Sequence, residues 1–130
     1  MTKTTSLLTA VAMIALAAPA FADDTPSSTS QTKEESDANG NYYKKTTTES
    51  TDAAGTTSES TKKVKVKHAS NGDVKKTVES ESSTDPKGLW NKTTASSSTT
   101  EEQKADGSTN YHHTKKINGT TVEDDKTQTN

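Results

Sequence analysis

The sequence predicts an extended antiparallel β-meander of about seven strands, arranged in a single layer without a conventional core. Only 25% of the 130 residues are hydrophobic, and much of that share lies in residues 1–22. Leu, Ile, Val and Phe supply seven of the 108 residues after Ala22, far below the ~20% under which disorder is suspected. The rest is low in complexity and rich in Thr, Ser, Lys and Glu, and regularly spaced turn sequences divide it into β-prone segments.

Intrinsic disorder after loss of the leader is the alternative fold class, because so few apolar side chains cannot offset the entropy of ordering the chain. The charges are nearly balanced, with 16 Lys, no Arg and 18 Asp plus Glu, so self-repulsion does not expand the chain. Cysteine is absent, which excludes disulfides and Cys-based zinc sites. The balance of charge and the β-propensity of Thr favour the sheet.

The first 22 residues have the three parts of a cleavable secretory signal peptide. A short positive start precedes an almost wholly apolar run over residues 7–18. Ala20 and Ala22 supply the small residues before the expected cleavage site, and Asp23 opens the mature chain. The apolar run would span roughly 18 Å as a helix, too short for a ~30 Å hydrocarbon core. We therefore expect a Sec-type leader, with a helix over residues 5–20.

The leader predicts export to a bacterial periplasm or to the outside of the cell. No Cys lies near the cleavage site, so a lipoprotein is not expected, and no later stretch is apolar enough to span a membrane. Residues 23–38 contain nothing more apolar than Ala and are expected to form a disordered lead-in.

Residues 39–130 form the Thr-, Ser-, Lys- and Glu-rich region, which six turn sequences punctuate. Every glycine of the chain stands in one of them, beside residues that favour tight turns. The predicted turn residues are Asn39 and Gly40, Gly55, Asn71 and Gly72, Pro86 and Gly88, Gly107, and Asn118 and Gly119. Six turns join about seven strand-like segments. Residues 98–105 offer a weaker alternative, because Ser98 to Glu101 match the capping box of a short helix.

The hairpin around residues 71–72 is the best specified, because valines alternate with polar residues on both sides. A connection of three or five residues would place all four valines on one face. Either Val64 or Val66 then lies opposite Val78. The two registers pair Lys63 or Lys65, respectively, with Glu79.

A weak internal repeat follows several turns, with an aromatic or β-branched residue before Lys and Thr. It covers residues 43–46, 74–77 and 90–93. The copies are spaced too irregularly for a solenoid and suit hairpins of varying strand length.

Catalytic and metal-binding chemistry is not expected. His112 and His113 are adjacent, so on a strand they would point to opposite faces, and His68 is the only other imidazole. Without an interior, no carboxylate or imidazole is desolvated for acid–base catalysis. We expect no enzyme activity, no cofactor and no nucleic-acid partner.

The expected function is a structural or interaction role in the envelope or a secreted matrix. The partner is unknown, with envelope polymers and self-association through strand edges as candidates. A disordered, hydrophilic periplasmic protectant linked to stress is the alternative, and a binder of glycans or anionic polymers is a further one.

Overall fold

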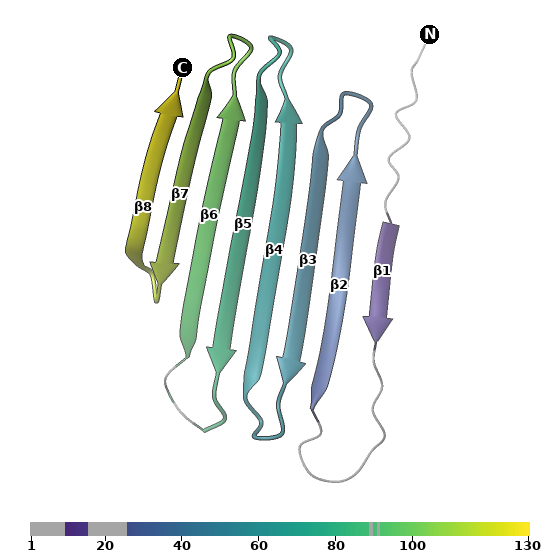
Figure 1. Ribbon diagram of the computed structural model, residues 1–130. Helices are drawn as coiled ribbons and strands as arrows, with labels where there is room; N and C mark the ends of the chain where they lie inside the picture. Colours follow the sequence, from purple (N-terminus) through teal and green to yellow (C-terminus); the bar gives the residue numbers. More distant parts are fainter. Residues whose placement is uncertain (1–9, 16–25, 89, 91) are drawn as a thin grey trace.

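The described part of the protein is an open sheet of eight antiparallel strands, in which neighbours in the chain are neighbours in the sheet (Figure 1). The computed structural model describes residues 10–15, 26–88, 90 and 92–130. The strands are β1 (Ala10–Ala15), β2 (Ser27–Ser36), β3 (Tyr42–Thr51), β4 (Thr57–His68), β5 (Val74–Asp85), β6 (Thr93–Gln103), β7 (Thr109–Ile117) and β8 (Thr120–Thr129). The expected β-meander is confirmed. Seven of its strands, β2 to β8, lie beyond residue 22.

The expectation of a helix over residues 5–20 is wrong for the part that is described. Residues 10–15 form β1, which pairs antiparallel with β2. The remainder of that interval lies outside the described residues. A short helix is marginal in water, whereas a strand on an open edge gains a ladder of backbone hydrogen bonds.

The lead-in expected over residues 23–38 contains the ten-residue strand β2, so disorder is the wrong expectation for residues 27–36. Two hydroxyl pairs, Ser30–Thr48 and Thr32–Thr46, lie in register with β3, and their oxygens are 3.3 Å apart in both pairs. A strand in a one-layer sheet needs no apolar face, which is why a sequence without large apolar residues still pairs. The short helix considered for residues 98–105 is also wrong, because β6 runs to Gln103 between β5 and β7.

Among residues 26–88, 90 and 92–130 no residue is buried, so this part of the sheet has no interior. The central strands are half-buried by their neighbours alone, and the outer strand β8 is exposed along its whole length. What holds the sheet together is therefore the backbone ladder and the contacts between side chains on adjacent strands.

The central hairpin has the first of the two expected registers. Val64 lies opposite Val78 and Lys63 opposite Glu79, across the five-residue connection 69–73. The ammonium–carboxylate contacts run diagonally, however. The distance from Nζ to the carboxylate oxygen is 3.9 Å for Lys63–Glu81 and 3.8 Å for Lys65–Glu79.

The sheet has two chemically different faces, because side chains alternate along each strand. The register places Val64, Val66, Val74 and Val78 on one side, which we call the valine face. The opposite side carries Lys33, Lys45, Lys63 and Lys65, and we call it the lysine face.

Candidate interaction surfaces

Each of the six predicted turn sequences lies between two consecutive strands of β2 to β8, three at each end of the sheet (Figure 1). Four of them are five-residue connections with one geometry. The first residue donates its N–H to the fifth carbonyl, and the glycine in fourth position, at positive φ, donates to the first carbonyl. Pro86 and Gly88 lie in the longer β5–β6 connection, and Asn118 and Gly119 form the two-residue β7–β8 turn. The expected cleavage residues Ala20, Ala22 and Asp23 lie outside the described residues.

An Asp or Asn side chain closes each five-residue turn. In the first turn the Asp37 carboxylate accepts the N–H groups of Asn39 and Asn41 at 2.9 and 3.0 Å, and the Asn41 side-chain amide at 2.8 Å. The Asn41 side chain is the main cause that lowers the pKa of Asp37. In the other three turns, the N–H of the fifth residue donates to the side chain of Asp52, Asn71 or Asp106.

Adjacent turns at one end of the sheet are also tied to each other. Asn41 Oδ1 accepts the N–H of His68, the last residue of β4 before the next turn, at 2.7 Å, and Asp73 Oδ1 accepts the Ala105 N–H at 2.9 Å. The second bond is the main cause that lowers the pKa of Asp73. Sequence reasoning missed these links, although both acceptors directly follow an Asn-Gly pair.

Three lysines stand side by side on the lysine face. Lys33 pairs with Lys45, and Lys45 with Lys63, in directly opposite positions of three adjacent strands. Lys33 contacts Glu35 at 2.6 Å, and their hydrogen bond raises the pKa of Lys33. Lys45 makes no ion pair with any described residue. Like charges in directly opposite positions destabilise a sheet, so this row is an unfavourable local arrangement that an anion would relieve.

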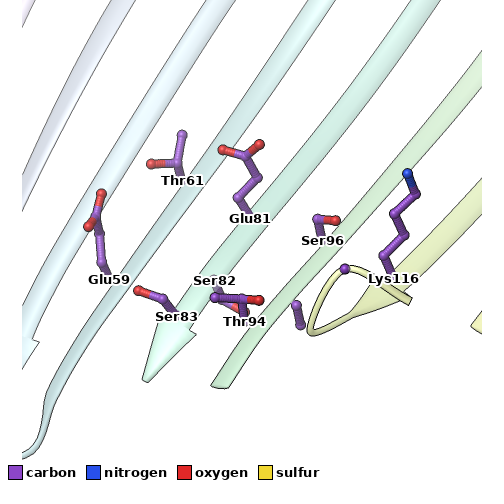
Figure 2. A pocket seen from close by; sticks show the side chains of 10 residues that line it. Glu59, Thr61, Glu81, Ser82, Ser83, Thr94, Ser96 and Lys116 are labelled. Carbon is purple, nitrogen blue, oxygen red and sulfur yellow. The ribbon is translucent and has the colours of Figure 1, made fainter. Parts of the chain in front are cut away.

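The other end of the lysine face is acidic and hollowed. Glu49 lies opposite Glu59. Glu59 lines a shallow depression of about 300 Å³, which also contains Glu81 and, toward its other side, Lys116 (Figure 2). Thr61 and several other hydroxyl-bearing residues line the same depression. Because it is open to water, it can hydrogen-bond a polar surface but does not desolvate a small substrate.

The two adjacent histidines tie β8 to β7, one on each face of the sheet. His112 Nε2 lies 2.7 Å from Asp124 Oδ1, and this hydrogen bond lowers the pKa of Asp124. His113 Nδ1 lies 2.8 Å from Thr99 Oγ1, and its Nε2 lies 3.9 Å from a Glu123 oxygen. No group of three or more His, Asp or Glu that could hold a metal ion occurs among the described residues.

Acid is expected to loosen β8 through Asp124. A carboxylate whose folded pKa is below the ordinary 3.8 contributes stability above that value and loses it as the pH falls through the folded pKa. Amide exchange of β8 should therefore accelerate, relative to β5, on acidification below about pH 4. Asp124→Asn should remove this extra acceleration.

The neighbouring Asp125→Asn is the matched control, because the Asp125 side chain makes no hydrogen bond or ion pair within the described part of the chain. It should retain the wild-type response. An identical acid response in Asp124→Asn and the wild type would show that the His112–Asp124 bond does not anchor β8.

Comparison of this chain with protein-family models, curated proteins and solved structures found no match. Within the described ranges, no helix has the length and apolarity needed to cross a membrane.

Proposed function

We propose that this chain is an exported, non-enzymatic structural or interaction protein of the bacterial envelope or a secreted matrix. The observation that carries the proposal is the one-layer sheet with both faces open, in which no residue of β2 to β8 is buried. Strands of nine to twelve residues, from β2 to β8, make each face a broad and nearly continuous surface.

The chemistry of the faces suits hydrated macromolecules. On the valine face, the in-register row Ser30, Thr48, Ser60 and Ser82 crosses four strands with hydroxyl groups only. Hydroxyls, ammonium groups and carboxylates can hydrogen-bond a polymer that keeps its water, and many weak contacts along one surface add up to stable attachment. A small-molecule enzyme requires the opposite, a concave site that excludes water.

Export is tested with the complete chain produced in a bacterium. We expect the protein outside the cytoplasm, bound to envelope fragments on sedimentation, with an intact mass that begins at Asp23. Ala22→Leu should block processing, because the residue before the cleavage site must be small. Asp24→Leu is the control that leaves this residue intact.

Two results would overturn the proposal. Retention of the unprocessed wild-type chain in the cytoplasm would exclude export. An exported chain that remains wholly soluble, with the circular dichroism of an unfolded polypeptide, would favour the disordered protectant.

Binding of an anionic polymer is a second candidate function, which the row of lysines favours. A polyanion laid across Lys33, Lys45 and Lys63 would relieve their mutual repulsion and release counterions. Retention on an immobilised polyuronate should weaken as salt increases, and Lys45→Gln should reduce it further. Lys115→Gln removes the same charge from the valine face and should bind like the wild type; equal losses for the two variants would exclude a site on the lysine face.

A further inference from the structure

We propose that β2 is a pairing edge, on which the β2 strand of a second copy docks antiparallel once the leader is removed. The inference rests on the proposed export, because the leader must leave the edge before a partner can take its place. The product is a two-fold dimer in which the sheets of the two copies become one.

The structure shows a strand already seated on this edge. Ala10 to Ala15 of β1 lie opposite Thr29 to Glu34 of β2 in an antiparallel register. The outward backbone groups of β2 therefore accept a second strand. Cleavage after Ala22 would remove β1 and leave those N–H and C=O groups unpaired.

The exposed edge lacks most of the usual features that prevent pairing, because its charged residues, Lys33 to Glu35, are confined to its C-terminal part. Ser27–Ser36 contains no proline or glycine, and its pairing with β3 continues without a register shift. From Ser27 to Thr32 every side chain is a hydroxyl or an amide. Such a segment neither repels nor sterically excludes an identical strand.

The opposite edge, β8, is protected. Its pairing with β7 shifts between Lys115 and Lys116, which marks a bulge or irregularity near the start of the strand. Glu123, Asp124 and Asp125 then follow in sequence, so a second β8 would meet a cluster of like charge. The two edges of the mature sheet are therefore unequal.

Strand direction selects β2 against β2. Consecutive strands alternate in direction, so β2 and β8 run the same way, and a β8–β2 contact between copies related by translation would be parallel. Parallel pairing is less stable per residue than antiparallel pairing. A two-fold axis near Ser30 pairs β2 with itself antiparallel and places Ser27 opposite Lys33, with neutral pairs between them.

Cross-linking tests the pairing directly, because the chain contains no cysteine. Ser30→Cys is introduced into the complete chain, and the exported protein is treated with a short bis-maleimide. We expect a covalent dimer, with at least tenfold less from Thr127→Cys on β8. The same Ser30→Cys change combined with Ala22→Leu should give no dimer, because β1 then stays on the edge.

Proline provides a second measurement by sedimentation. Adjacent N–H groups of an edge strand point alternately inward and outward, so one of Ser30→Pro and Gln31→Pro removes only an outward group. That variant should keep the sheet and lose the dimer.

The intact mass separates the two proposals. A processed, exported and folded chain that stays monomeric, or that cross-links equally through Thr127→Cys, overturns the β2 pairing and leaves export standing. A chain that retains its leader overturns export, and the pairing with it.

Discussion

Proline at Thr61 or at Lys62 will unfold the sheet. Both residues lie in β4, which pairs with β3 on one side and β5 on the other. Whichever way the N–H points, proline removes a ladder hydrogen bond worth about 1 kcal/mol net, and its ring also restricts φ in a central strand. No buried core among residues 26–88, 90 and 92–130 offsets this loss. Urea titration followed by far-ultraviolet circular dichroism should show no folded baseline for either variant.

The matched control variants place proline in β8, which pairs with β7 alone in the structure. One of Thr127→Pro and Gln128→Pro removes an N–H that points away from the sheet, and that variant should unfold at the wild-type urea concentration. Loss of the sheet in both β8 variants would mean that this edge is covered in solution. A wild-type signal in both β4 variants would mean that the chain does not form the sheet in solution.

The order and spacing of the strands could be predicted because turn chemistry is local. Asn71 and Gly72 favour a tight reversal by their own conformational preferences, and the alternation of valines around them limits the pairing to two registers. The local sequence therefore predicts the pairing of Val64 with Val78 as one of two alternatives, and the structure has that one.

The strand β2 was missed because apolar alternation is the usual signal for a strand, and residues 27–36 have none. That signal reports a face packed on a core, and strands β2 to β8 contain no buried residue. The strand β1 was missed for another reason. Its apolar composition is typical of a signal-peptide helix. Composition alone does not show that these residues can instead pair as a strand with the open edge of the sheet.

The repeated sequence words did not correspond to a structural repeat. Tyr43 is the second residue of β3, whereas Val74 is the first residue of β5. The two copies of the repeat therefore begin at different positions in their strands, one residue apart. A shift of one residue moves a side chain to the other face. The repeat that the structure shows is the five-residue turn itself.

The bonds between turns depend on distant partners. Asn41 and His68 are 27 residues apart, and Asp73 and Ala105 are 32 residues apart. No local pattern specifies such a pair, because it forms only after the strand lengths bring two turns side by side. Because of these hydrogen bonds, each turn must hold its conformation for the neighbouring turn to keep its own contacts.

Gly72→Ala is expected to destabilise the sheet more than the same change in an isolated turn. Gly72 has φ +93°, a left-handed conformation that costs other residues about 1–2 kcal/mol. An added Cβ would also lie 3.3 Å from the Ala105 Cβ in the adjacent turn, where the Asp73–Ala105 bond holds the two together. Urea unfolding should therefore show the backbone strain together with a steric penalty.

Gly107→Ala isolates the first of these effects. Gly107 has φ +90°, and an added Cβ would meet nothing within 4 Å. The difference between the two variants then measures the contact between turns, and adding Ala105→Gly to each should cancel it. Equal losses from Gly72→Ala and Gly107→Ala would mean that the turns move independently in solution. A larger loss at Gly72 would show that the sheet, although one layer thick, unfolds with its turns coupled, because the strain at one turn would pass to the next through the Asp73–Ala105 bond.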